Sequence, residues 1–182
     1  MKLFRAGDHI VCGENVYGGT FRLFDRLLQN FGLEFTYVDT RDPNRIEEAC
    51  RTRTVAVLVE TPTNPLMRLT DISAAAEIAH RAGALLIVDN TFATPVLQRP
   101  FTHGADIVFH STTKYLNGHS DSIGGVVVAT RDAVYSKVLS NVEEVKARRG
   151  RVLAIVNDGD SEVARLADHV IEVPETDDML TP

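Results

Sequence analysis

Short apolar runs alternate along the chain with segments in which apolar residues recur every three or four positions. Most of the runs are continuous rather than alternating, which is typical of strands buried on both faces of a sheet. The predicted strands are 9–13, 34–39, 55–60, 84–89, 106–110, 125–129, 151–157 and 169–173. This order of strands and helices predicts an α/β fold, with a mostly parallel sheet between two layers of helices.

The helical segments are bounded by residues that commonly start or stop helices. The predicted helices are 18–32, 43–52, 69–84, 131–150 and 160–169. Asp42 and Pro43 form a cap followed by a first-turn proline, and the third helix begins near Thr70 or Asp71 and ends at Gly83. No helical pattern separates 106–110 from 125–129, so this pair is either antiparallel or separated by a long functional loop.

Composition narrows the class of protein. The chain has 182 residues and a formal net charge of −6, which argues against a nucleic-acid partner. No apolar run is long enough to cross a bilayer, and we see no signal peptide. Cys12 and Cys50 lack metal-type spacing, so we expect free thiols in a reducing cytoplasm. His103, His110 and His119 show no metal spacing either, and we predict no metal site.

Polar residues follow three of the predicted strands at the point where each strand ends. In open α/β sheets, ligands bind at the carboxyl ends of the strands, so these residues are candidates for a binding site. They are Glu60, Thr61 and Asn64, then Asp89, Asn90 and Thr91, then Ser111, Thr113 and Lys114.

Each candidate also has an ordinary structural interpretation. Asp89 could cap a turn, Lys114 could be solvated, Ser111 and Thr113 could form turns, and Tyr17 could pack in the core. The alternative is a carboxylate that holds a cation, a nucleophilic lysine, hydroxyls that bind a phosphate and a ring that stacks on a planar ligand. That combination is the pattern of a pyridoxal phosphate site.

Several long motifs resemble one family. The segments "VYGGTFRLF", "VETPTNP", "IVDNTFATPVLQRPFTHGADIVFHSTTKYLNGHSD" and "GGVVVA" are similar to the Cys/Met-metabolism family of pyridoxal phosphate enzymes, over about residues 5–134. This family includes cystathionine γ-synthase, the cystathionine lyases and methionine γ-lyase. The resemblance implies transsulfuration chemistry and the large domain of the aspartate-aminotransferase fold class.

The resemblance also implies a role for each candidate residue. Lys114 would form a Schiff base with the cofactor, and Asp89 would pair with its pyridine nitrogen. The phosphate-binding and ring-contacting residues implied by the family are Ser111, Thr113, Asn64 and Tyr17. Tyr17 would stack on the ring and assist the leaving group, and Asn64 would lie near the 3-oxygen. Elimination or replacement at Cβ or Cγ of an amino acid would follow.

The ends of the chain depart from the family pattern. By this resemblance we expect the N-terminal arm and the phosphate loop to be missing before "MKLFRAGDHIV", and the C-terminal domain, whose arginine would bind the substrate carboxylate, to be missing as well. Residues 134–182 resemble instead the second sugar-isomerase (SIS) domain of glucosamine-6-phosphate synthase. We therefore expect a chimera joined near 134–136, with 1–134 as a cofactor-domain fragment and 135–182 as an SIS-like βαβ piece. Together they would form a single α/β domain over 1–182, with strands 151–157 and 169–173 added to the sheet edge.

Three functions stay open at this point. The first is residual pyridoxal phosphate binding with little or no turnover of a small amino-acid substrate. The second is an engineered structural chimera without ligand chemistry, and the third is an SIS-like module that binds a sugar phosphate. We expect a cytoplasmic protein with no membrane or nucleic-acid partner, in which exposed former interfaces favour a homo-oligomer.

Overall fold

The computed structural model describes residues 3–119, 121–129, 143, 146–147, 152–157 and 161–173. Contacts within the chain define two compact units, chiefly Phe4–Val128 and Ala129–Thr181. A single domain over 1–182, divided at 134/135, stays a prediction.

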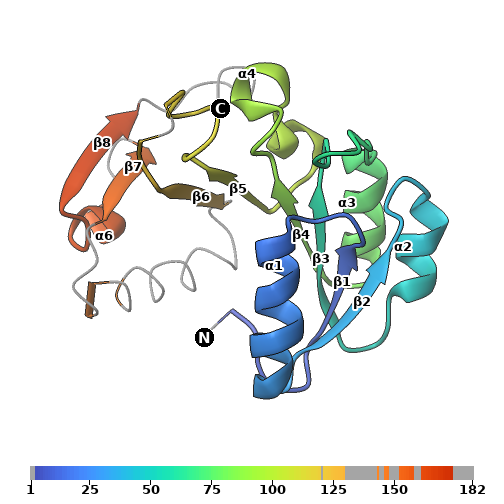
Figure 1. Cartoon of the computed structure of the whole chain (residues 1–182). Helices are drawn as coiled ribbons and strands as arrows, with labels where there is room; N and C mark the ends of the chain where they lie inside the picture. Colours follow the sequence, from blue (N-terminus) through green and yellow to red (C-terminus); the bar gives the residue numbers. More distant parts are fainter. Residues whose placement is uncertain are drawn as a thin grey trace. The chain divides into compact units, whose positions relative to one another are not determined.

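The larger unit is built on one sheet with the strand order β2-β1-β3-β4-β5-β6 (Figure 1). The strands are β1 His9–Gly13, β2 Glu34–Val38, β3 Thr54–Glu60, β4 Leu85–Asp89, β5 Ile107–Ser111 and β6 Gly125–Ala129. The pairs β1–β2, β1–β3, β3–β4 and β4–β5 are parallel. Strand β6 lies next to β5, so the two strands without a helix between them are neighbours. The mostly parallel α/β sheet predicted from the apolar runs is confirmed.

Helices cover both faces of this sheet, with α1 on one face and α2 and α3 on the other (Figure 1). The helices of the larger unit are α1 Gly18–Leu23, α2 Pro43–Ala49, α3 Ile72–Arg81 and the short α4 Thr94–Leu97. Helix α1 continues as a π-helix, η1 Phe24–Leu28, and a 3₁₀ turn, η2 Gln29–Phe31; a second 3₁₀ turn, η3, spans Pro100–His103. These elements confirm the first three predicted helices.

Local side chains explain where the helices begin and end. The Asp42 carboxylate accepts a hydrogen bond from the Asn44 amide at 3.0 Å, and Asp71 accepts one from the Ala74 amide at 3.0 Å. Both aspartates therefore satisfy amides that have no partner in the first helical turn. After η2 the chain turns at Gly32, whose φ of 83° is costly for residues with a Cβ.

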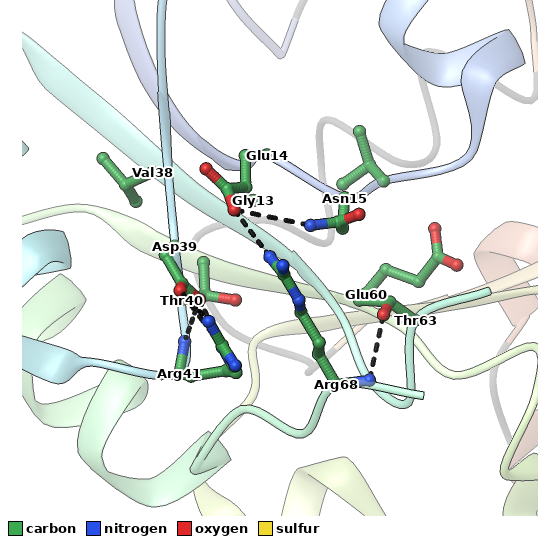
Figure 2. Close-up of a pocket in the computed structure, with 11 residues that line it drawn as sticks. Gly13, Glu14, Asn15, Val38, Asp39, Thr40, Arg41, Glu60, Thr63 and Arg68 are labelled. Atoms are coloured by element: carbon green, nitrogen blue, oxygen red, sulfur yellow. Dashed lines mark hydrogen bonds and ion pairs between the residues drawn. The ribbon is translucent and has the colours of Figure 1, made fainter. Parts of the chain in front are cut away.

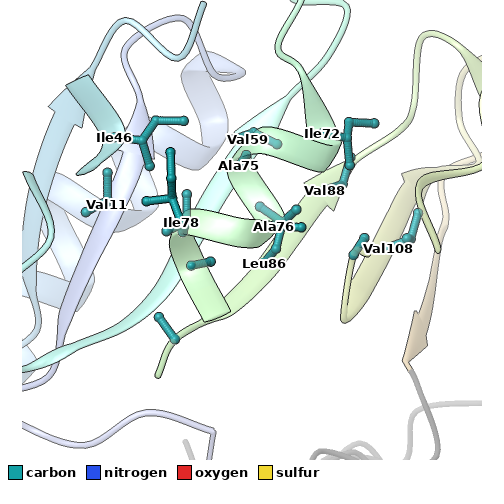
Figure 3. Packing of buried hydrophobic residues seen from close by; sticks show 14 residues of the cluster. Val11, Ile46, Val59, Ile72, Ala75, Ala76, Ile78, Leu86, Val88 and Val108 are labelled. Atoms are coloured by element: carbon teal, nitrogen blue, oxygen red, sulfur yellow. The ribbon is translucent and has the colours of Figure 1, made fainter. Parts of the chain in front are cut away.

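The core lies between the sheet and α3 (Figure 3). Alanines on the buried face of α3 let the helix approach the branched side chains of β3 and β4 closely. The buried cluster comprises Val11, Ile46, Val57, Val59, Ile72, Ala75, Ala76, Ile78, Ala79, Ala84, Leu86, Val88, Ala105 and Val108. This packing fixes β3 and β4, and so fixes the positions of the residues at their carboxyl ends.

Truncating a side chain in this core should destabilise the larger unit. Leu86 is 0% exposed, and Leu86→Ala removes buried methyl groups and leaves a cavity, so we expect a loss of about 2–5 kcal/mol in the free energy of unfolding. Denaturant unfolding followed by circular dichroism measures it. Val96 is 85% exposed, and Val96→Ala should change this free energy by less than about 0.5 kcal/mol. Equal effects of the two variants would contradict the assignment of the core.

The smaller unit contains β7 Leu153–Asn157, α6 Ser161–Ala164 and β8 His169–Val173. Strands β7 and β8 pair in parallel in a two-stranded sheet of their own. The expectation that these strands extend the edge of the main sheet is therefore wrong. The intervening α6 returns the chain beside β7, so β8 satisfies the backbone groups of β7 locally. Most of the predicted helix 131–150 lies outside the described residues.

Membrane-spanning helices, metal sites and free thiols were also considered in the predictions from composition. No helix in the described part of the chain is long and apolar enough to span a membrane. Among the residues that the structure describes, no three His, Cys, Asp or Glu side chains form a cluster that could hold a metal ion. Cys12 and Cys50 are free thiols, and burial raises the pKa of the Cys12 thiol well above its usual range.

Candidate functional site

The carboxyl ends of β1, β3, β4 and β5 lie along one edge of the sheet, and the predicted site residues follow these ends (Figure 1). Tyr17 lies between β1 and α1, and Asn64 lies in the loop after β3. Asp89 is the last residue of β4, and Ser111 is the last residue of β5. We call this edge the carboxyl rim.

Asp89 is a buried carboxylate on the carboxyl rim, only 8% exposed. Its Oδ1 accepts two hydrogen bonds from Thr91, one from the amide at 3.0 Å and one from the hydroxyl at 2.5 Å. Burial raises the pKa of Asp89, and the Thr91 hydrogen bonds oppose this shift in part. Since both recorded hydrogen bonds go to Oδ1, Oδ2 is available to a cationic partner.

Thr91 also connects the ends of two strands. Its hydroxyl oxygen accepts a hydrogen bond at 2.8 Å from the amide of Ser111, while its proton goes to Asp89. The end of β4 is therefore tied to the end of β5. Sequence reasoning noted Thr91 at a strand end but gave it no role. The Asp-x-Thr spacing, in which a carboxylate accepts from the residue two positions on, is the signal that could have found it.

Glu60 is a second buried carboxylate on the carboxyl rim, only 6% exposed. Its Oε2 accepts a hydrogen bond from the Tyr17 amide at 2.6 Å, and its Oε1 accepts one from the Asn64 amide at 3.3 Å. Glu60 lies in register with Asp89 on the neighbouring strand. Burial raises the pKa of Glu60, and the charge of Asp89 raises it further. Sequence reasoning noted Glu60 but assigned it no role.

The side chains of Tyr17 and Asn64 are exposed. The Tyr17 ring lies against Gly19 in the first turn of α1, where an added Cβ would be only 2.3 Å from Cε1 of the ring. Glycine at position 19 therefore leaves room for this placement of the ring. Both residues are anchored through their backbone amides, and their side chains are free to meet a ligand.

Lys114 lies in the turn that follows β5. Its amide donates a hydrogen bond to the Ser111 carbonyl at 3.2 Å, and its carbonyl accepts one from the Gly118 amide at 3.0 Å. The lysine side chain is exposed. The Thr113 hydroxyl accepts from the Gly124 amide at 3.0 Å and donates to the Gly124 carbonyl at 3.3 Å, so it would have to redirect its proton to bind a phosphate.

Two connected groups therefore emerge on the carboxyl rim. Glu60 joins the loops of Tyr17 and Asn64, and Thr91 joins Asp89 to the strand that leads to Lys114. Register pairing of Glu60 with Asp89 links the two groups. Within the described residues, no recorded side-chain hydrogen bond or ion pair joins Lys114 to Asp89.

A pocket lies at the carboxyl ends of β1, β2 and β3, and Glu60 contributes to its lining (Figure 2). Arg68 is directed at Glu14, with 2.6 Å between their charged atoms, and Arg41 pairs with Asp39. The hydrogen bond from Arg41 lowers the pKa of Asp39 to about 2. Since each arginine already has a carboxylate partner, this pocket offers little net positive charge to an anion.

The donor set of the carboxyl rim fits pyridoxal phosphate. A protonated pyridine nitrogen is a cationic donor, and Asp89 Oδ2 is an acceptor on a largely buried residue whose other carboxylate oxygen is already satisfied. Lys114 supplies an amine in the turn after the adjoining strand β5, and Tyr17 supplies an exposed ring. The residues present could therefore hold this cofactor.

Comparison with known proteins shows a family that uses this cofactor. The family model for Cys/Met metabolism PLP-dependent enzymes matches residues 1–157. The chain is 56% identical to cystathionine γ-lyase of Bacillus subtilis over 128 residues, which are 70% of this chain and 34% of that protein. It is 49% identical to L-methionine γ-lyase of Porphyromonas gingivalis over 142 residues, 78% of this chain and 36% of the relative.

Solved structures agree in fold. The structure of cystathionine γ-lyase from Lactobacillus plantarum, complexed with L-serine, matches with a TM-score of 0.73 and 54% identity. The match covers 75% of this chain and 36% of that one. This likeness supports the aspartate-aminotransferase-type fold expected for the larger unit.

The family match also bears on the expected chimera. It continues to residue 157, past the junction expected near 134–136, and so does not support a change of family there. None of the relatives or structures described above supports an SIS domain in residues 134–182. The chain spans between 34% and 43% of the length of such curated relatives. It belongs to the family of pyridoxal-phosphate-dependent enzymes of Cys/Met metabolism.

Proposed function

We propose that the carboxyl rim binds pyridoxal phosphate, with Lys114 as the residue that bonds covalently to its aldehyde. The observation that carries the proposal is the buried Asp89 carboxylate, whose Oδ1 is satisfied by Thr91 while Oδ2 has no recorded hydrogen-bond partner among the described residues. A buried carboxylate is costly without a cationic partner, and a pyridinium N–H is such a partner.

The other site residues orient the same group. Ser111 and Thr113 offer hydroxyls to the phosphate, Asn64 lies toward the 3-oxygen, and Tyr17 stacks on the ring. The bound cofactor supplies an electron sink for negative charge at Cα of an amino acid. With the cofactor bound, Lys114 Nζ would be the base that takes the proton from Cα, and the Asp89 carboxylate would hold the proton on the ring nitrogen.

The reaction class that follows is elimination or replacement at Cβ or Cγ of a sulfur-containing amino acid, as in transsulfuration. Support comes from the relatives, which are named as cystathionine lyases, a cystathionine synthase and methionine lyases. Since the chain spans about a third of their length, we propose cofactor binding for these 182 residues and little or no turnover by them alone. A homo-oligomer and a cytoplasmic location stay predictions.

Titration with pyridoxal phosphate tests this function directly. We expect a saturable yellow absorbance band, followed after borohydride reduction by a cofactor mass on the peptide that contains Lys114. Pyridoxamine phosphate, which has no aldehyde, is the matched control and should leave no mass after reduction. An absorbance spectrum that equals the sum of protein and free cofactor would reject the proposal.

No observation favours the alternatives. A structural chimera without ligand chemistry gives no reason for the Asp89 carboxylate to be buried at the end of β4, and no sugar-isomerase catalytic residue can be assigned in residues 134–182. We therefore do not extend the proposal to sugar phosphates.

A further inference from the structure

Glu60 is buried at the end of β3, yet no catalytic or cofactor-binding role requires its charge. A buried carboxylate is kept where it accepts several hydrogen bonds, and Glu60 accepts one on each oxygen. Its two donors are the amides of Tyr17 and Asn64, which lie 43 and 4 positions away in the chain. One carboxylate therefore ties the β1–α1 loop to the β3–α3 loop.

The bond to Tyr17 constrains a ring that little else holds. The Tyr17 side chain is 62% exposed, and its amide lies at the start of α1, where a helix offers donors without acceptors. The distance of 2.6 Å from this amide to Glu60 Oε2 is the shorter of the two bridges. Because the ring and this amide belong to the same residue, a shift of the Tyr17 backbone also moves the Tyr17 ring.

We propose that Glu60 is a positioning residue that sets the place of the Tyr17 ring and the Asn64 side chain over the cofactor site. This inference deepens the proposed function and rests on it. Both oxygens of Glu60 are occupied by the amides of Tyr17 and Asn64, so Glu60 would act through the backbone of the two loops. The groups that face its carboxylate are the amides of Tyr17 and Asn64, and the carboxylate of Asp89 in register on β4.

A double-mutant cycle in the full chain tests this role. Glu60→Gln keeps the size of the side chain but presents an NH₂ group to one of the two amides. We expect Glu60→Gln and Tyr17→Ala each to weaken pyridoxal phosphate binding by about tenfold, and the double variant to weaken it by about tenfold rather than a hundredfold. If Glu60 acts only through Tyr17, either single variant already removes the contribution of the Tyr17 ring, so the second substitution has nothing further to remove.

Two controls separate positioning from general damage. Ser111→Ala combined with Glu60→Gln should show multiplied effects, because Ser111 lies on β5, β4 lies between β5 and β3, and no hydrogen bond joins Ser111 to Glu60 in the described part of the chain. Glu14→Gln, a partly exposed carboxylate paired with Arg68, should leave binding within about twofold of the wild type. Multiplied effects for the Glu60 and Tyr17 pair would overturn the inference.

Amide hydrogen exchange provides a readout that does not need the cofactor. Glu60→Gln should speed exchange at the Tyr17 or Asn64 amide by about tenfold or more, while the core amide of Val57 stays unchanged. If the wild type shows no cofactor absorbance, the proposed function fails, and unchanged exchange at both amides would independently refute the role of Glu60. If Glu60→Gln does not fold, Glu60→Asp is used instead in both the binding and the exchange measurements. Its side chain is one methylene shorter, so the carboxylate lies farther from the two amides.

Discussion

Alanine at position 114 is expected to abolish the yellow absorbance that pyridoxal phosphate produces with the wild-type chain. Lys114→Ala removes the amine that bonds to the cofactor aldehyde, so no covalent product can be trapped by borohydride. The lysine side chain is exposed, and its loss should change the free energy of unfolding by less than about 0.5 kcal/mol. Absorbance titration and mass mapping of the reduced protein measure both consequences.

Lys146→Ala is the matched control, because it removes another lysine, one that pairs with Asp168 at 2.6 Å in the smaller unit. This variant should keep both the absorbance band and the cofactor mass. Equal absorbance in Lys114→Ala and the wild type would show that any binding is adventitious attachment to other amines, and would reject Lys114 as the reactive residue.

Replacing Asp89 by asparagine should weaken cofactor binding by about 10- to 100-fold. Asparagine keeps an oxygen for the Thr91 hydrogen bonds but loses the charge that pairs with the pyridinium, and a hydrogen bond to a charged group contributes about 1.5–3 kcal/mol. The dissociation constant from absorbance titration measures the effect. Asp71→Asn is the control, since asparagine caps a helix as well as aspartate does, and it should bind the cofactor normally.

Without cofactor, Asp89→Asn should have a larger free energy of unfolding than the wild type. This difference in the free energy of unfolding should grow as the pH rises. Burial raises the pKa of Asp89 in the folded state, so the folded state holds its proton more tightly than the unfolded state does. The contribution of Asp89 to stability is therefore complete below its ordinary pKa and is lost as the pH rises through the raised value. Asparagine does not titrate, so the advantage of Asp89→Asn should grow across this window. A constant difference between the two proteins from pH 4 to pH 8 would contradict this account.

Opposite effects on binding and stability would identify Asp89 as a residue retained for function. If Asp89 only capped a turn, replacing it would lower the stability of the protein and leave its affinity for the cofactor unchanged. The two measurements on one variant therefore distinguish the structural interpretation of Asp89 from the functional one.

Much of the larger unit could be predicted from the sequence because its signals are local. Continuous apolar runs gave the six strands of the sheet to within a residue or two. The caps at Asp42 and Asp71 and the stop at Gly32 depend on neighbours within a few residues. The placement of β7 and β8 could not be derived this way, because which strand edge pairs with which depends on contacts between distant segments.

In the candidate site, too, features with local signals could be predicted, whereas those that depend on contacts between distant segments could not. The residue types at the strand ends, and above all Lys114 and Asp89, were evident from the order of apolar runs and polar residues. The connecting roles of Thr91 and Glu60 were not. Thr91 meets Ser111 only because β4 pairs with β5, and Glu60 meets the Tyr17 amide only because β1 lies beside β3.

The sequence by itself therefore determined the α/β class, the strands and the chemical groups available for a pyridoxal phosphate site. Only the tertiary structure decided which of those groups are buried, which oxygens are already satisfied and which loops share an anchor. The physical reason is that a hydrogen bond or a desolvated charge depends on distance in space, and parallel pairing brings together residues such as Tyr17 and Glu60 that are far apart in the chain.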